Sequence, residues 1–251
     1  MLLPMLAAAA FWSDSVFPAR VALISAGAVA LITVPLIVVT GSRAGLIALI
    51  IAVALIPVIG VYRTKVRHPQ RGGAATAAYG IAAACFGALL WMTVFASRDT
   101  ALIRFEQVDE DLRYPVWVSI VDVLPHYLPW GTGIGSYVDV YQILEPDRLL
   151  RPTFSNHAHN EWLEVALTAG VPGLVLLACA VLLFCIGIRR ALRTSGPRGA
   201  FSRLGLGLIL ILSFASTFDY PLRTPIMASV LAIAAVWACS YKRFGNEDWR
   251  G

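Results

Sequence analysis

The sequence has 251 residues, of which 58% are hydrophobic and only 14% are charged. Soluble domains average about 45–50% apolar and about 25% charged residues, so this composition excludes both an ordinary soluble domain and a disordered chain. The formal net charge is +5, but the basic residues lie scattered between apolar runs and do not share one face. This distribution argues against a nucleic-acid partner. The composition therefore predicts an integral membrane protein.

Six uninterrupted apolar runs follow one another along the chain. A helix crosses the hydrocarbon core of a bilayer with about 20 apolar residues, and all runs except the fifth approach that length. We therefore expect an all-α, polytopic membrane protein with about six transmembrane helices and one large loop that contains short helices. A shorter apolar segment, 1–12, precedes the runs. The runs are 21–39, 44–62, 74–96, 171–188, 204–218 and 225–241.

The charges between the runs predict a sidedness. Lysine and arginine gather between the second and third runs, between the fourth and fifth, and after the sixth. Short cytoplasmic loops are enriched in these residues, and all three places lie on one side if each run crosses once. The long loop then lies outside the cytoplasm, with five arginines and eleven acidic residues. The predicted domains are 1–96 with three spans, the loop 97–170, and 171–251 with three more spans.

The loop is expected to have structure of its own. Loops of this length are usually functional and not simple connectors. Apolar residues recur in it at helical spacing, which predicts an amphipathic helix, and Pro125 and Pro129 are expected to end this helix. A glycine-rich turn at 131–135 and a second amphipathic stretch follow. The periodic residues of the first helix are Val116, Trp117, Ile120, Val121 and Leu124.

Two arginines on the outer side are candidate anion-binding residues. Arg43 lies at the hairpin between the first two runs, and Arg113 lies at the start of the loop helix. A planar guanidinium can bind a phosphate through two parallel hydrogen bonds. Two simpler interpretations stay open. Arg43 could snorkel to the lipid headgroups, and Arg113 could form a local ion pair with the acidic residues at 109–111.

The third candidate is the segment from His157 to Glu164, directly before the fourth run. A neutral imidazole acts as a general base near neutral pH when a carboxylate or amide orients it. Asn160 and Glu164 are candidates for that orienting role, as is Glu161. His157 and His159 would point in different directions on a helix, so metal binding by the pair would need a non-helical start. A structural role for an interfacial histidine is the alternative.

Together these motifs resemble the O-antigen ligase and polymerase superfamily. The resemblance spans about residues 40 to 188 and implies a multi-pass protein of the bacterial inner membrane whose active face is periplasmic. It also implies that the chain corresponds to the C-terminal half of a family member. The resemblance is carried by Gly-Ser-Arg43, by Arg113 with Trp117, by Pro-Trp-Gly-Thr-Gly-Ile-Gly at 129–135, and by His159-Asn160-x-x-Leu163-Glu164 followed by Gly-Val-Pro-Gly at 170–173.

The resemblance implies a glycosyltransferase that moves a glycan from undecaprenyl diphosphate to a hydroxyl of lipid A-core. The transfer would be inverting and would need no metal or cofactor. Arg43 and Arg113 match the family's diphosphate-binding arginines, and His159 matches its catalytic histidine, with His157 as the second candidate. The partners would be this lipid-linked donor, the acceptor and the membrane lipids.

Two alternatives stay open beside this function. An O-antigen or exopolysaccharide polymerase would use a growing glycan as the acceptor. A protein of another class would be a transporter of lipid-linked glycans, or a non-catalytic or truncated membrane component. A transporter is expected to carry ionisable groups in mid-span, and the six runs contain essentially none.

Overall fold

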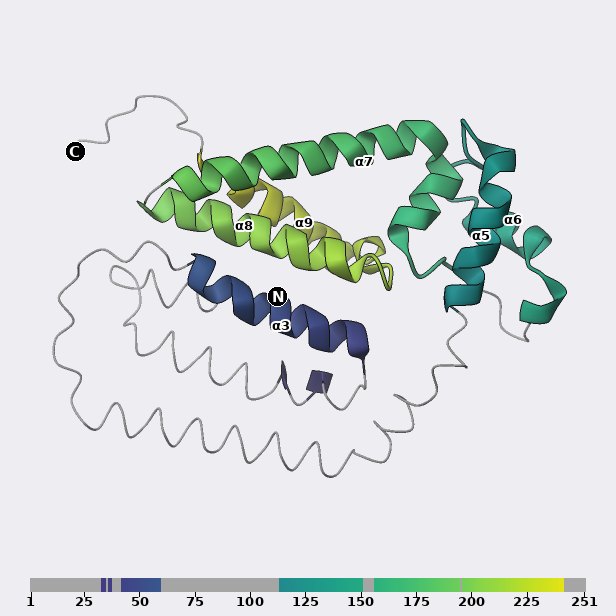
Figure 1. The fold of residues 1–251 in the computed structure, drawn as a ribbon, viewed down its shortest axis with the longest axis horizontal. Coiled ribbons are helices and arrows are strands. Elements are labelled where there is room, and N and C mark those ends of the chain that lie inside the picture. The colour runs from purple at the N-terminus through teal and green to yellow at the C-terminus, as the bar shows by residue number, and fades with distance from the viewer. Residues whose placement is uncertain are drawn as a thin grey trace. The chain divides into compact units, whose positions relative to one another are not determined.

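The computed structural model describes residues 33–34, 36–37, 42–59, 113–150, 156–194 and 196–241. Within these residues the protein is helical and contains no β-strand, as expected for an all-α fold. Three short 3₁₀ turns accompany the helices, at Asp147–Leu149, Pro221–Arg223 and Cys239–Tyr241. The α-helices of the described part are α3 (Arg43–Ile59), α5 (Arg113–Tyr127), α6 (Tyr137–Leu144), α7 (Glu161–Arg193), α8 (Gly196–Ala215) and α9 (Pro225–Ala238) (Figure 1).

Two of the described helices are long and apolar enough to cross a membrane, Glu161–Arg193 and Arg198–Ala215. Two more apolar helices are shorter, Ala44–Ile56 and Pro225–Ala238. Four of the six predicted runs are therefore helical over most of their length. The runs 21–39 and 74–96 and the segment 1–12 lie wholly or mostly outside the described residues. The count of six spans, the sidedness and the three domains stay predictions.

The chain forms two compact units, each assembled from segments that are distant in the sequence. Unit 1 contains α3, the first part of α8 and the last turns of α9, whereas unit 2 contains α5, α6, most of α7 and the turn before α9. Unit 1 consists of Met1–Glu106, Arg189–Ile211 and Ile233–Gly251, and unit 2 of Gln107–Ile188 and Leu212–Ala232.

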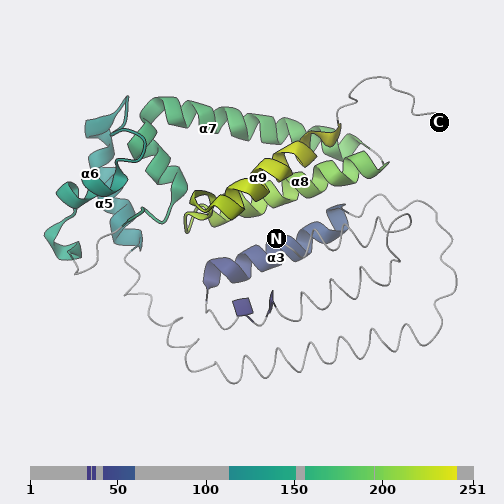
Figure 2. The ribbon, with the colours of Figure 1, turned by 180° about the vertical axis from the view of Figure 1, so that it is seen from behind.

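In unit 1 the last turns of α9 lie against α8 (Figure 2). Gly205 of α8 permits this approach, because a methyl group there would meet backbone atoms of Ala234 and Ala238. At the start of α3, Ser42 acts as the N-cap, and its hydroxyl accepts a hydrogen bond of 3.0 Å from the backbone N–H of Gly45. Unit 1 thus combines a close contact between α8 and α9 with a capped N-terminus of α3.

Arg203 joins the ends of two helices in unit 1. Its buried guanidinium donates hydrogen bonds to the carbonyls of Ala191 at 3.0 Å and Thr194 at 3.2 Å, at the end of α7. It also donates to the carbonyl of Ile59, at 3.4 Å, where α3 ends. The last carbonyls of a helix lack partners within the helix and carry partial negative charge, so a cation there is favourable.

In unit 2, α7 is interrupted at Gly170, directly before the residue where the fourth apolar run begins. Gly170 has φ 57° and ψ −147°, outside the helical region, so α7 consists of two helical pieces. The break brings two backbone segments into contact, because a methyl group at Gly131 would lie 2.7 Å from the backbone nitrogen of Gly170 and from the carbonyl oxygen of Thr168. The chain therefore needs glycine on both sides of this contact.

The glycine-rich turn supplies the hydrogen bonds that the break removes from α7. Its N–H groups bind the last carbonyls of the first piece of α7, and the carbonyl of Pro129, just before the turn, accepts from the first N–H of the second piece. The sequence predicted this turn but not its partner. The bonds run from Thr132 N to Leu167 O at 2.9 Å, from Gly133 N to Thr168 O at 2.9 Å, and from Val171 N to Pro129 O at 2.7 Å.

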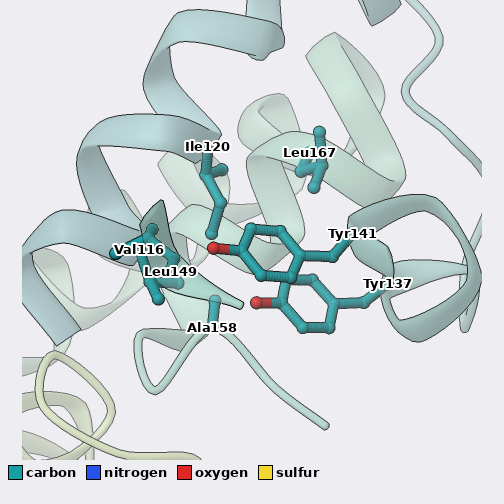
Figure 3. Packing of buried hydrophobic residues seen from close by; sticks show 7 residues of the cluster. All are labelled: Val116, Ile120, Tyr137, Tyr141, Leu149, Ala158 and Leu167. Atoms are coloured by element: carbon teal, nitrogen blue, oxygen red, sulfur yellow. The ribbon is translucent and has the colours of Figure 1, made fainter. Parts of the chain in front are cut away.

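The core of unit 2 lies between α5, α6 and the first piece of α7 (Figure 3). The rings of Tyr137 and Tyr141 stack with centroids 5.3 Å apart. The Tyr141 hydroxyl lies 3.2 Å from the hydroxyl of Ser119, and burial raises the pKa of Tyr141 above its ordinary value. The buried residues of this core are Val116, Ile120, Tyr137, Tyr141, Leu149, Ala158 and Leu167.

The helix predicted from the apolar periodicity is confirmed as α5, with two corrections. Its buried face is formed by Val116, Ser119 and Ile120, and Val121 is exposed. Pro125 does not end the helix, which runs to Tyr127. A proline removes only one backbone hydrogen bond, so a final turn can continue past it when later bonds form. Here the N–H of Leu128 still donates to the carbonyl of Leu124, at 3.3 Å.

Candidate functional site

The candidate site is built around the short non-helical segment that precedes α7. Ala158, at the centre of this segment, is fully buried. Its carbonyl accepts a hydrogen bond of 2.8 Å from the indole N–H of Trp117 in α5. Its backbone N–H donates to Oε2 of Glu164 in α7, at 3.1 Å. The segment is thus fixed from both sides, and the flanking side chains of His157 and His159 remain partly exposed.

Glu164 is a buried carboxylate with three polar neighbours. Besides the N–H of Ala158, its Oε1 lies 3.2 Å from Nδ1 of His157. The same oxygen lies 2.7 Å from Nη2 of Arg223. A carboxylate removed from water is costly unless it is paired and hydrogen-bonded, and these neighbours meet that need. Glu164 therefore holds a histidine and an arginine together.

His159 is paired with a different carboxylate. Its Nδ1 lies 3.3 Å from Oδ1 of Asp219, whose side chain is 59% exposed. His159 itself adopts a left-handed backbone conformation, with φ 50°, which is uncommon for a residue other than glycine. Its Nε2 makes no hydrogen bond with the residues that the structure describes. A carboxylate at Nδ1 favours the tautomer whose proton lies on that nitrogen, which leaves the Nε2 lone pair for a substrate.

The ring of Tyr220 lies against both histidines. The ring centroids are 4.4 Å apart for His157 and 5.0 Å apart for His159. The backbone N–H of Tyr220 also donates to Oδ1 of Asp219, at 3.0 Å. The two imidazoles, the aromatic ring and the aspartate thus form one cluster, with each histidine facing a different carboxylate.

Glu161, in the first turn of α7, fixes the turn that carries Asp219 and Tyr220. Its buried carboxylate accepts a hydrogen bond of 2.6 Å from the Ser216 hydroxyl and one of 2.9 Å from the backbone N–H of Leu222. The backbone N–H of Glu161 donates in return to the carbonyl of Ser216, at 2.8 Å. Three hydrogen bonds therefore join the start of α7 to the segment between α8 and α9.

The family of the chain follows from a comparison with known protein families. A family model described as O-antigen ligase matches residues 28–178, more than half of the chain. The chain belongs to the O-antigen ligase family. No curated protein and no solved structure matches it. The family match includes Arg43, Arg113 and both histidines, so the resemblance seen in the sequence is confirmed.

Five of the six site residues that the sequence predicted for this O-antigen ligase family member lie within unit 2. They are His157, His159, Asn160, Glu164 and Arg113. Asn160 acts as the N-cap of α7, because its Oδ1 accepts a hydrogen bond of 3.1 Å from the backbone N–H of Leu163. This cap fixes the direction in which the chain leaves the histidine segment.

The two predicted diphosphate-binding arginines begin different helices. Arg113 is the first residue of α5 and is partly buried, one helical turn before the Trp117 that holds the histidine segment. Residues separated by one helical turn lie on the same face of a helix. Arg43 is the first residue of α3 and belongs to unit 1. Their roles toward a diphosphate stay predictions.

Sequence reasoning missed the turn between α8 and α9. The sequence shows only a short interval between the fifth and sixth apolar runs, yet this interval contributes Asp219, Tyr220 and Arg223 to the site. These residues also lie outside the range that the O-antigen ligase family model matches. One signal was present in the sequence, because an acid, an aromatic residue and an arginine occur together on the side predicted for the large loop.

Proposed function

We propose that this O-antigen ligase family member transfers a glycan from undecaprenyl diphosphate to a hydroxyl of lipid A-core on the periplasmic face of the inner membrane. The observation that carries the proposal is His159, a partly exposed histidine that a carboxylate orients through Nδ1. An imidazole in this state has the chemistry of a general base. It occurs beside a second histidine and an arginine, within a membrane protein of a family that uses lipid-linked glycans.

In the proposed reaction, Nε2 of His159 takes the proton of the acceptor hydroxyl. The hydroxyl oxygen then forms a bond to the anomeric carbon, and the bond between that carbon and the diphosphate oxygen breaks. Attack opposite the leaving group inverts the anomeric centre. Asp219 stabilises the imidazolium that forms, as an aspartate does beside a catalytic histidine. The arginines stabilise the negative charge that develops on the departing undecaprenyl diphosphate.

The leaving group explains why positive charge is central to this proposal. A diphosphate is a good leaving group and requires stabilisation of developing negative charge more than a proton donor. Arg43 and Arg113 are the residues that we assign to it, because a guanidinium binds phosphate oxygens in pairs. The proposed transfer requires no metal ion or cofactor.

His159 is favoured over His157 as the base because of the carboxylates that they face. Glu164 beside His157 is buried and already paired with Arg223. Asp219 beside His159 is joined to no cation among the described residues. Its charge therefore acts on His159 without competition from another ion pair.

The test is transfer by the purified protein in lipid bilayers, with a glycan on undecaprenyl diphosphate as the donor and lipid A-core as the acceptor. His159→Ala should lower kcat by about 100-fold or more, whereas His157→Ala should leave measurable transfer. Arg43→Ala should lose transfer activity, and Arg43→Lys should restore only part of it. A lysine ammonium keeps the positive charge but cannot form the two parallel hydrogen bonds of a guanidinium. Near-normal transfer by His159→Ala would overturn the proposed base. A product in which one lipid-linked glycan extends another would identify a polymerase, and transport without transfer would exclude an enzyme.

A further inference from the structure

Arg223 is a cation beside the two histidines, and it has no role in the proposed reaction. It ends the 3₁₀ turn Pro221–Arg223, and its side chain is 37% exposed. The guanidinium has five N–H donors; among the described residues it forms an ion pair with Glu164, and its charge also acts on the nearby carboxylate of Glu161. Most of its donors therefore have no hydrogen-bond partner among the described residues. An arginine in this state can bind a further anion.

Two buried carboxylates of α7 fix the place of this guanidinium. Glu164 holds its Nη2 at 2.7 Å, and Glu161 holds the preceding residue through the N–H of Leu222, at 2.9 Å. Both the backbone and the head group of the arginine are thus tethered. A side chain that is already ordered loses less conformational entropy when it binds a ligand, so this arrangement favours binding over a loose surface contact.

The guanidinium also lies beside the proposed chemistry. Oε1 of Glu164 contacts Arg223 and His157 at once, and the ring of Tyr220 contacts His157 and His159. The cation and both imidazoles therefore belong to one continuous set of contacts within unit 2. A phosphate bound to Arg223 would lie next to the histidines and not on a remote surface.

We propose that Arg223 binds a phosphate group of a lipid substrate, with Glu164 holding its guanidinium in place. The inference rests on the proposed function, because it assigns a task to Arg223 at that site. Two substrates could supply the phosphate, namely the diphosphate of the donor and a phosphate on the lipid A-core acceptor. The chemistry is the same in both cases, and the experiment below separates them.

A purely structural ion pair is the competing explanation. In that case Arg223 only neutralises the buried charge of Glu164, and its loss changes stability without changing the affinity for a substrate. A lysine at this position keeps the positive charge toward Glu164 but loses the planar fork. Arg223→Lys therefore separates the two explanations even where Arg223→Ala folds poorly.

The experiment measures binding of undecaprenyl diphosphate without a glycan to the full chain in lipid nanodiscs. The variants are Arg223→Ala and Arg223→Lys, with Arg148→Ala as the matched control, since Arg148 is exposed in the same unit and has no ion pair among the described residues. A lost hydrogen bond to a charged group corresponds to a roughly 10- to 100-fold weaker Kd. We expect that loss for Arg223→Ala, a smaller loss for Arg223→Lys, and none for the control.

The second measurement is the KM for lipid A-core in the transfer assay. An unchanged Kd for undecaprenyl diphosphate together with a roughly 10-fold or greater rise of this KM assigns the phosphate to the acceptor and supports the proposal. If both values stay within about twofold of wild type in Arg223→Lys, the proposal is overturned and the ion pair is structural. Loss of transfer in His159→Ala with intact lipid binding tests the proposed function separately, so failure of one is distinguishable from failure of the other.

Discussion

Oδ1 of Asp219 lies 3.3 Å from Nδ1 of His159, across 60 residues of sequence. The two residues meet because the turn that carries the aspartate is fastened to the first turn of α7, directly after the segment that carries the histidine. The pair gives the histidine a defined tautomer. Its strength is limited by the exposure of the aspartate, since water screens an exposed pair.

Asp219→Asn should lower kcat without a comparable change in KM. The amide keeps the size of the side chain but loses the charge that stabilises the imidazolium. An exposed pair contributes up to about 1 kcal/mol, which corresponds to a transfer slowed by up to roughly fivefold. Asp139→Asn is the control, because Asp139 is an exposed acid of α6 in the same unit. Equal kcat values for the two variants would contradict a role for the pair.

Glu161→Ala should destabilise the protein and slow transfer together. The change removes the acceptor for the Ser216 hydroxyl and for the N–H of Leu222, and a buried donor left without a partner costs roughly 1–3 kcal/mol. Glu161→Gln should recover most of both losses, because an amide can still bond to a hydroxyl and an N–H. Thermal unfolding in detergent and the transfer rate provide the readouts. If Glu161→Gln is as impaired as Glu161→Ala, the negative charge of Glu161 matters and not its hydrogen bonds to Ser216 and Leu222.

Gly131→Ala should be far more harmful than Gly135→Ala. Both glycines have positive φ, 78° and 88°, so each substitution carries a backbone cost of roughly 1–2 kcal/mol. A methyl group at Gly131 would also lie 2.7 Å from the backbone of Gly170, whereas the space beside Gly135 is open. The difference between the two unfolding temperatures therefore reports the packing at the break in α7. Equal temperatures would mean that this packing is loose.

Trp117→Phe should lower both stability and activity, although the side chain at this position remains aromatic. The substitution removes the donor to the buried carbonyl of Ala158, at a cost of roughly 1–3 kcal/mol. The histidine segment then loses one of its two attachments. Trp130→Phe is the matched control, because Trp130 is highly exposed. Wild-type transfer by Trp117→Phe would show that Glu164 alone holds the segment.

The sequence predicts the helices more completely than it predicts the site. Apolar periodicity located α5, and its helical face differed from the prediction only where Val121 turned outward. Periodicity reports which residues could share a face, but the neighbours that cover that face come from elsewhere in the chain. The exposure of Val121 therefore could not be derived from spacing alone.

The same limit explains what was missed at the site. His157, His159 and Glu164 are close in sequence, so their association was predictable. Asp219 and Arg223 join them only through tertiary contacts with the start of α7. Such contacts leave no local pattern in the sequence, and a short polar turn between apolar runs is usually a connector. The family match ends at residue 178, before this turn, and so does not indicate a role for its residues.

The break at Gly170 separates the orientation of the site from the length of the apolar helix that follows it. In an unbroken α-helix, one inserted residue rotates everything beyond it by about 100°, since a turn contains 3.6 residues. Here the hydrogen bonds from Thr132, Gly133 and Val171 fix the first piece of α7 to its own neighbours. The orientation of the carboxylates of Glu161 and Glu164 is thus set by these contacts and not by the number of residues in the apolar piece that follows.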